Sequence, residues 1–181
     1  EYHSGSTVLL GEVVRRVSGM SLADFASLFL FQPLGIDQSI WAECRNAPGV
    51  AFAGGGLYLR PRDLAKVGLL FLQGGSWGET QVISSEWVNQ SVQTAVISQS
   101  QSASHYLGTG YGYLWWTGRF DGGHDAYMAK GWGGQFIVVI PGLDLVTVVT
   151  GGNYDVNSSS AEVPFGIYDD IVYGHVLPAI R

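Results

Sequence analysis

The chain has 181 residues, 46% of them hydrophobic and only 13% charged, which predicts one well-buried globular domain rather than a disordered chain. Its net charge of −6, with Lys66 and Lys130 as the only lysines, excludes the basic patch that a nucleic-acid-binding surface needs. Cys44 is the single cysteine, so an internal disulfide and a cysteine-based metal site are excluded, and no apolar run predicts a membrane-spanning helix.

The first half of the chain has helical periodicity. A stripe of Leu and Val over residues 9–17 predicts a first helix, with Ser6 or Thr7 as its N-cap and Gly19 just past its end. A second helix is expected to begin at Ser21 and to stop near residues 33–35. It should carry a capping box between Ser21 and Asp24 and bury Leu22, Phe25, Leu28 and Phe29.

The segment that follows predicts a loop, two helices and a second loop. Residues 36–60 predict a loop that contains the cluster Gly54-Gly55-Gly56. The next helix is expected from Pro61 to Gln73, because proline suits the first helical turn and two glycines follow. Another helix should begin at Ser84, and the Ser/Gln-rich residues 93–110 predict a surface loop.

Extended structure is expected in the last third. Residues 111–117, 135–140 and 143–150 are β-branched and aromatic runs, and Pro141-Gly142 between the last two indicates a hairpin. Residues 165–177 predict a closing helix with Ile167, Ile171 and Val172 on one face. Helices followed by antiparallel strands predict an α+β fold rather than an alternating βαβ fold.

Two short motifs could carry chemistry. In Tyr2-x-Ser4, a tyrosinate near a cation could take a proton from a nucleophilic hydroxyl and return it to a leaving group. In Ala129-Lys130-Gly131-Trp132-Gly133-Gly134-Gln135, the glycines let the backbone approach a ligand closely, and an exposed N–H there could stabilise an oxyanion. An ordinary loop and a glycine-rich turn remain the alternatives.

Other motifs predict structure rather than chemistry. The glycine cluster before Arg60-Pro61-Arg62-Asp63 lacks the Gly-Lys-Ser/Thr of a phosphate loop and predicts a tight turn leading into a helix, with Asp63 favoured in its first turn. His124-Asp125 could belong to a Ser-His-Asp triad, but their glycine-rich surroundings favour a surface loop. The histidines show no metal-ligand spacing, so no metal site is predicted. Three tryptophans could line a substrate cleft: Trp115, Trp116 and Trp132. Trp115 and Trp116 are adjacent on a predicted strand, so their side chains should point to opposite faces.

Taken in chain order, these features resemble the penicillin-recognising serine hydrolases. Tyr2-x-Ser4 stands before a Leu-Leu-Gly helix, and residues 32–35 read Gln-Pro-Leu-Gly. The glycine cluster then precedes a Pro-Arg-Asp-Leu-Ala helix, and Gly-Trp-Gly-Gly-Gln at residues 131–135 precedes the Pro141 hairpin. The family includes class C β-lactamases, DD-peptidases, esterases and amide hydrolases. The turn resembles most closely the branch that contains esterases and 6-aminohexanoate-dimer hydrolases. The resemblance covers nearly the whole chain and implies the C-terminal part of the β-lactamase/transpeptidase-like fold, with helices packed on an antiparallel sheet.

The resemblance also implies a site and its chemistry. The family site combines a Ser-x-x-Lys nucleophile motif, a Tyr-x-Asn or Tyr-x-Ser motif and a Lys/His-Thr-Gly-like strand. It implies that Tyr2 shuttles protons and that Ser4 is its hydrogen-bonding partner. Lys130 and Gly131 would lie in the substrate-binding third element, and the backbone N–H of Trp132 would enter the oxyanion hole. The implied substrate is a small-molecule ester or amide, such as a β-lactam or a peptide, and no metal or organic cofactor is implied.

The sequence departs from the family pattern twice. No Ser-x-x-Lys is present, because Asp63 stands three residues before Lys66 and Tyr127 three before Lys130. The third element begins with Ala129, where β-lactamases carry lysine, and Lys130 should face the other side of the strand. This second departure favours esterase, amidase or peptidase chemistry over β-lactamase chemistry.

These departures lead to the hypothesis that the chain is the C-terminal portion of a serine hydrolase and is inactive in isolation. We expect it to need a missing N-terminal segment, a partner fragment or an oligomer to cover an exposed sheet. By family resemblance, a periplasmic or secreted location is favoured. The main alternative is a non-catalytic homologue that acts as a binding or regulatory module. An all-β carbohydrate-binding module is a weaker alternative, because four amphipathic helices argue against it.

Overall fold

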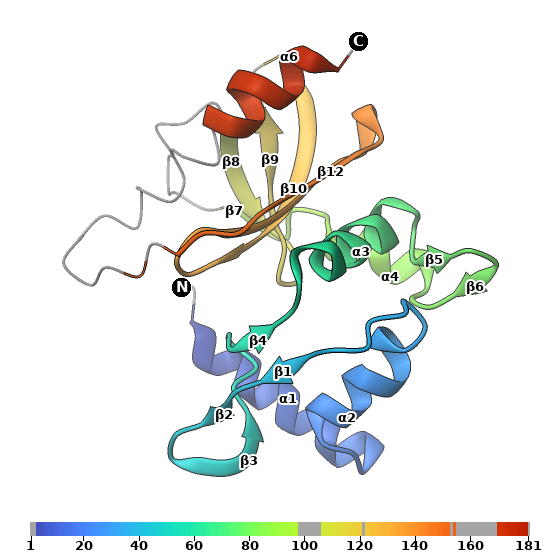
Figure 1. The fold of residues 1–181 in the computed structure, drawn as a ribbon, viewed down its shortest axis with the longest axis vertical. Helices are drawn as coiled ribbons and strands as arrows, with labels where there is room; N and C mark the ends of the chain where they lie inside the picture. The colour runs from blue at the N-terminus through green and yellow to red at the C-terminus, as the bar shows by residue number, and fades with distance from the viewer. Residues whose placement is uncertain (1–2, 98–105, 121, 153, 155–169, 181) are drawn as a thin grey trace. The chain divides into compact units, whose positions relative to one another are not determined.

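The structure is a computed structural model that describes residues 3–97, 106–120, 122–152, 154 and 170–180. The chain divides into two compact units, Glu1–Asp63 and Leu64–Arg181 (Figure 1). No helix among the described residues is long and apolar enough to cross a membrane.

The first unit begins with helix α1, Ser4–Ser18. His3 occupies the N-cap position with extended backbone, so the predicted caps Ser6 and Thr7 were placed too late in the chain. Thr7 already lies inside the helix, and its hydroxyl donates to the Ser4 carbonyl over 2.5 Å. The predicted end is confirmed, because Gly19 adopts a left-handed φ of 74° and its N–H donates to the Arg15 carbonyl.

Helix α1 buries none of its residues. Its apolar stripe lies at the surface, with exposed fractions of 69% for Leu9, 54% for Leu10, 54% for Val13 and 84% for Val17. On the polar side, the Glu12 carboxylate accepts hydrogen bonds from the guanidinium Nε atoms of Arg15 at 2.7 Å and Arg16 at 2.8 Å. The helix is therefore amphipathic, as predicted, but its apolar face is open to solvent.

The second helical segment combines helix α2, Leu22–Ala26, with a π-helical turn η1, Ser27–Phe31. The predicted N-cap is confirmed, because the Ser21 hydroxyl accepts from the Asp24 N–H at 3.0 Å. The Asp24 carboxylate accepts the Ser21 hydroxyl at 2.6 Å. The wider π turn changes which side chains face inward. Leu28 and Phe29 are 45% and 52% exposed, so their predicted burial was wrong. The buried apolar residues around this segment are Ala26, Phe31, Leu34 and Ile36.

Residues 36–60 were predicted as a loop, and the structure instead shows two small antiparallel pairs there. Strand β1, Ile40–Trp41, pairs with β4, Leu57–Tyr58. Strand β2, Glu43–Cys44, pairs with β3, Ala47–Ala51. Three of these strands have only two residues, which is too short for an alternating pattern to be visible in the sequence.

The second unit is built on a six-stranded antiparallel sheet with the order β12-β11-β10-β9-β8-β7. Helix α3, Pro61–Leu72, and helix α4, Ser85–Ser91, precede all six strands of this sheet and confirm the predicted helices. A small pair, β5 Ser76–Trp77 and β6 Thr80–Gln81, lies between them. The sheet strands are β7 Val96–Ile97, β8 Tyr106–Tyr111, β9 Trp116–Phe120, β10 His124–Gly131, β11 Gln135–Ile140 and β12 Leu145–Val149.

Apolar clusters cover both faces of this sheet. On one face, Met128 and Val138 pack in a cluster with Val172 of the π turn η3, Val172–Val176, which leads into α6, Leu177–Ala179. Figure 1 shows this C-terminal helix alongside strands β8, β9 and β10. On the other face, Tyr127 and Val139 pack in a cluster with residues that include Phe71 of α3. Strand β11 is therefore buried on both sides, which explains its continuous apolar run.

Helix α3 approaches the sheet closely at Gly68. A Cβ atom at this position would lie 2.6 Å from Val146 Cγ1 and 2.8 Å from Ile137 Cγ2, far inside normal contact. Any larger residue would push the helix away from β11 and β12. Gly68 thus sets the spacing between the helix and the sheet.

Two sequence predictions in this unit were wrong in part. The predicted strand over 111–117 is broken, because Tyr111 ends β8 and Trp116 begins β9. A Cβ atom at Gly112, between them, would lie 2.2 Å from the Ser91 carbonyl oxygen, and Leu114 has a left-handed φ of 69°. The surface loop predicted over 93–110 contains β7 and most of β8 among its described residues.

The predicted hairpin and fold class agree with the structure, and the closing helix agrees in part. The β11–β12 hairpin forms around a 3₁₀ turn, η2 Pro141–Leu143, and Asp144 completes the reversal with a left-handed φ of 48°. In the closing helix Val172 is fully buried, but Ile171 is 40% exposed, so the prediction that these two residues share one buried face was wrong. Ile167 lies outside the described residues. Helices combined with an antiparallel sheet confirm the predicted α+β class.

Candidate functional site

The first candidate element stands at the start of α1. Tyr2, the predicted proton shuttle, lies outside the described residues. Ser4 is the first residue of the helix and is half-buried. Its carbonyl accepts the Thr7 hydroxyl, and the preceding His3 carbonyl accepts the Ser6 N–H at 3.1 Å. The backbone at Ser4 is therefore held by the first turn of the helix.

The glycine cluster packs directly against Ser4. A Cβ atom at Gly54 would lie 2.5 Å from the Ser4 carbonyl oxygen and 2.9 Å from Ser4 Cβ. The indole N–H of Trp41 donates to the carbonyls of both Phe52 and Gly55 at 3.2 Å, which fixes the loop from the other side. The sequence indicated a turn here but not its contact with Ser4. Consecutive glycines are the only sequence signal for such a close approach.

The second candidate element is the turn between β10 and β11. Gly131 pairs with Gln135 at the end of the ladder, so Trp132, Gly133 and Gly134 form a three-residue connection. Gly133 and Gly134 have φ values of 79° and 91°, a region that other residues rarely adopt. Trp132 is 63% exposed at this tip. The predicted glycine turn is confirmed as the apex of a hairpin.

The structure places Lys130 on the side of the sheet predicted for it. Its ammonium nitrogen lies 5.5 Å from the centre of the Trp116 ring. Trp116 packs on the cluster that contains Met128, whereas Ala129 packs on the opposite cluster with Tyr127. Desolvation lowers the pKa of the Lys130 ammonium, although the side chain as a whole is exposed. The charge therefore lies over an aromatic ring, on the face opposite Ala129.

Residues near the turn that the sequence did not single out are Tyr154 and Gly151. The Gln135 side-chain amide donates to the Gly151 carbonyl at 2.5 Å and to the Tyr154 hydroxyl at 3.2 Å. Both partners follow β12 in the chain, and no local pattern links them to the turn. Only the register of the β11–β12 hairpin brings them together.

The weaker candidates have structural contacts. His124 and Asp125 begin strand β10 rather than lying in a loop, and the Asp125 carboxylate accepts the Arg119 Nε–H at 2.6 Å. This hydrogen bond holds the pKa of Asp125 below its usual value. Trp115 and Trp116 pack in clusters on opposite faces of the sheet, as predicted. Among the described residues, no group of three or more His, Cys, Asp or Glu could hold a metal ion.

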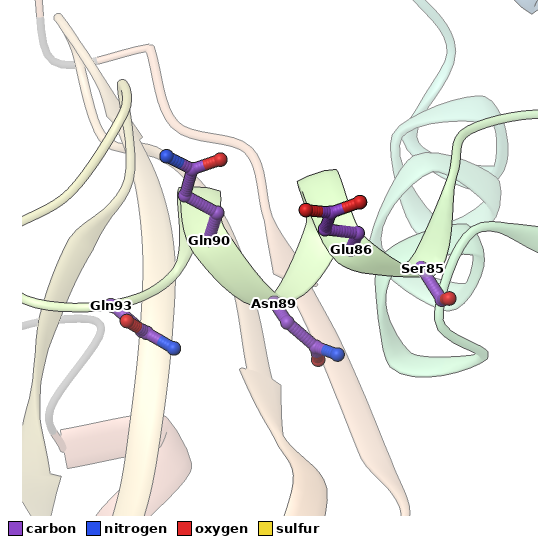
Figure 2. A pocket seen from close by; sticks show the side chains of 5 residues that line it. All are labelled: Ser85, Glu86, Asn89, Gln90 and Gln93. Carbon is purple, nitrogen blue, oxygen red and sulfur yellow. The ribbon is translucent and has the colours of Figure 1, made fainter.

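A polar hollow lies elsewhere in the second unit, along helix α4. Figure 2 shows the side chains that line it, four from α4 and one, Gln93, from just after the helix. The hollow has a volume of about 560 Å³ and is open to solvent. None of the candidate site residues lines it. The lining residues are Ser85, Glu86, Asn89, Gln90 and Gln93.

Two motifs identified from the sequence thus have defined local geometry, each within its own unit. A comparison with protein families adds the deciding observation: the family model described as beta-lactamase matches residues 1–157. The chain belongs to the beta-lactamase family. The resemblance derived from the motif order is therefore confirmed.

Individual relatives agree with this family. Over 88 residues the chain is 34% identical to the 6-aminohexanoate-dimer hydrolase of Paenarthrobacter ureafaciens, covering 49% of this chain and 22% of that protein. A candidate 6-aminohexanoate-dimer hydrolase from Bacillus anthracis superposes with a TM-score of 0.77 at 24% identity, over 100% of this chain and 45% of the other. An octameric penicillin-binding protein homologue from Pyrococcus abyssi superposes with a TM-score of 0.74 at 19% identity, over 98% of this chain and 42% of the other.

These likenesses establish the fold and the general class. The two superpositions are below 25% identity, and they show the beta-lactamase/transpeptidase-like fold alone. The chain spans less than half the length of each of these two structures.

Proposed function

We propose that this chain supplies the C-terminal part of a serine hydrolase that cleaves an ester or amide through an acyl-enzyme. The observation that carries the proposal is the confirmed hairpin turn over residues 131–135, together with Tyr2-x-Ser4 in the same family-matched segment. The similarity to a 6-aminohexanoate-dimer hydrolase favours a linear amide or ester as substrate. The replacement of the family lysine by Ala129 is consistent with this preference.

In this proposal each element has one task. A serine from a Ser-x-x-Lys segment outside these 181 residues attacks the carbonyl carbon. Tyr2, with the lysine of that segment, takes the serine proton and passes it to the leaving group. Ser4 hydrogen-bonds within this relay. The Trp132 N–H donates to the carbonyl oxygen as it becomes an oxyanion, and water then releases the acyl group.

Gly131 and Lys130 have different parts in the substrate-binding strand. Gly131 leaves room for the substrate backbone or ring beside the end of β10, because it carries no side chain. Lys130 acts indirectly, since its ammonium lies over Trp116 on the opposite face from Ala129. Its contact with that ring stabilises the end of β10, from which the turn projects.

Open apolar surfaces support a need for further polypeptide. The α1 stripe that contains Leu9, Val13 and Val17 is more than half exposed. Within the described sheet, β12 is an edge strand, and residues 145–149 read Leu-Val-Thr-Val-Val with no charge or proline to protect the edge. We propose that an N-terminal segment, a partner fragment or another copy covers these surfaces. Assembly of copies has a precedent in the octameric homologue.

The experiment compares the 181-residue chain with the complete protein, meaning the product of the full open reading frame that encodes it. We expect no acylation burst from the chain with nitrocefin or a p-nitrophenyl ester. We expect the complete protein to gain the mass of an acyl group in intact mass spectrometry. In the complete protein, Tyr2→Phe should lower the acylation rate by about 10²-fold or more, as for loss of a general base, while His3→Phe serves as the neighbouring control.

A second candidate function is that of a binding or regulatory module without catalysis. The absence of Ser-x-x-Lys from these 181 residues favours it. This alternative predicts that the complete protein also lacks the motif and binds an ester or amide without acylation. A complete protein with the motif that forms an acyl-enzyme would exclude it. A complete protein that binds substrate but gains no mass would overturn the hydrolase proposal.

A further inference from the structure

We infer that Gln135 and Tyr154 are positioning residues that hold the turn at Trp132, Gly133 and Gly134 in the conformation needed for oxyanion binding. This inference rests on the proposed function. Gln135 begins strand β11, and Tyr154 follows strand β12. The contacts that carry it all lie within the second unit, among described residues.

The first contact is polar. Gln135 opens strand β11 and pairs with Gly131 across the base of the turn. Its side-chain amide donates one hydrogen bond to the Gly151 carbonyl at 2.5 Å and another to the Tyr154 hydroxyl at 3.2 Å. One amide group therefore links the base of the turn to the segment that leaves β12. Methionine at this position would retain the length of the side chain but donate neither bond.

The second contact is steric. The Tyr154 ring lies so close to Gly133 that a Cβ atom there would be 2.3 Å from the ring. On the same side, a Cβ atom at Gly151 would be 2.5 Å from the Gly133 carbonyl oxygen and 3.2 Å from that of Gly134. The turn is thus packed tightly against residues 151 and 154. Both glycines are needed for this approach, since any side chain would separate the two segments.

These contacts matter because the turn is intrinsically flexible. Glycine loses more conformational freedom on folding than any other residue, and two adjacent glycines here adopt positive φ values. An oxyanion hole stabilises its transition state only if the donor is already in place when charge develops. Trp132 is 63% exposed and has little packing of its own to fix its N–H. The contacts of Gln135 and Tyr154 restrain the turn where packing of Trp132 does not.

Three variants separate the polar contact from the steric one. Gln135→Met removes both hydrogen bonds, Tyr154→Phe removes only the hydroxyl, and Tyr154→Ala removes the ring against Gly133. Gln90→Met is the matched control, because Gln90 is an exposed glutamine on helix α4 (Figure 2) and makes none of the contacts described for the turn. Tyr154→Phe is the mildest change and keeps the proposal testable if Tyr154→Ala fails to fold.

The first measurement is amide hydrogen exchange of Trp132, Gly133 and Gly134 in the 181-residue chain, which requires no activity. We expect exchange to rise roughly tenfold or more in Gln135→Met and Tyr154→Ala, by less in Tyr154→Phe, and not at all in Gln90→Met. Unchanged exchange in both Gln135→Met and Tyr154→Ala would overturn the inference.

The second measurement is steady-state kinetics of the complete protein with a p-nitrophenyl ester. We expect kcat to fall by about 10- to 100-fold in Gln135→Met with KM within about twofold, because only the transition state carries the oxyanion. Binding of a boronic acid, which imitates the tetrahedral intermediate, should weaken in parallel. A fall that appears only in KM, or a loss of melting temperature with kcat unchanged, would show a merely structural contact and refute the role. If exchange responds as expected but the wild-type complete protein forms no acyl-enzyme, the proposed function is wrong and the restraint on the turn stands.

Discussion

The ammonium nitrogen of Lys130 lies 5.5 Å from the centre of the Trp116 ring, one strand away in the sheet. Trp116 pairs with Met128, two residues before Lys130 on the same face of β10. The cation therefore stabilises the end of β10 through an aromatic neighbour. Its partial desolvation, which lowers the pKa of the ammonium, is consistent with this packing.

A double-mutant cycle measures this contact. Lys130→Met and Trp116→Leu should each reduce the free energy of unfolding, with a coupling of about 0.5–1 kcal/mol for a partly exposed cation–π pair. Urea unfolding of the wild type, both single variants and the double variant gives the coupling. The complete protein with Lys130→Met should keep its acylation rate within about twofold. A coupling near zero combined with a large loss of acylation would instead place Lys130 at the substrate.

Gly54→Ala tests the close approach of the glycine cluster to Ser4. The added methyl group would lie 2.5 Å from the Ser4 carbonyl oxygen, so the loop or the start of α1 must move. We expect the free energy of unfolding to fall by about 1–3 kcal/mol, the usual cost of overpacking. Gly174→Ala is the control, because a Cβ atom at Gly174 would meet nothing within 4 Å. Equal stability of the two variants would contradict the contact with Ser4.

Tyr127 makes stability depend on alkaline pH. Burial raises its pKa from the ordinary 10.0 to about 12. In the unfolded chain the phenol ionises at the lower value, so between these two pH values the folded state holds more protons. Stability is therefore constant with respect to this group below pH 10 and falls as the pH rises towards 12.

Tyr127→Phe is the variant that isolates this effect. The difference in free energy of unfolding between wild type and Tyr127→Phe should change across the alkaline range and stay constant at neutral pH. Urea unfolding at several pH values, with Tyr113→Phe as an exposed control, measures it. An identical alkaline dependence in wild type and Tyr127→Phe would show that the phenol ionises normally.

Val13→Gln tests whether further polypeptide covers the α1 stripe. Val13 is 54% exposed in the 181-residue chain, so the change should alter the free energy of unfolding there by no more than about 0.5 kcal/mol. If the complete protein buries this face, the same change should cost it about 1–3 kcal/mol. Ser6→Gln, on an exposed position of the same helix, is the control. An unchanged free energy of unfolding in both proteins would show that the stripe stays exposed and would contradict the proposed N-terminal cover.

Features governed by neighbouring residues could be predicted from the sequence. The N-cap at Ser21, the glycine that ends α1 and the proline that begins α3 all act through hydrogen bonds or backbone angles within a few residues. The β11 run could be predicted because burial on both faces leaves a continuous apolar pattern. The glycine turn at residues 131–135 could also be predicted, because its positive φ values at Gly133 and Gly134 favour glycine. With it, one element of the candidate site was visible.

Features set by distant residues could be known only from the tertiary structure. The break between β8 and β9 depends on Gly112 packing against Ser91, and the exposure of Leu28 and Phe29 follows from a π turn that shifts the helical face. The approach of Gly54 to Ser4 and that of Tyr154 to Gly133 cannot be predicted from the residues next to them in the sequence. Sequence by itself determined the local elements and the family motifs, because capping and periodicity act over a few residues. Tertiary structure alone decided which glycines are crowded and which side chains restrain the turn, because such contacts depend on strand register and packing between segments far apart in the chain.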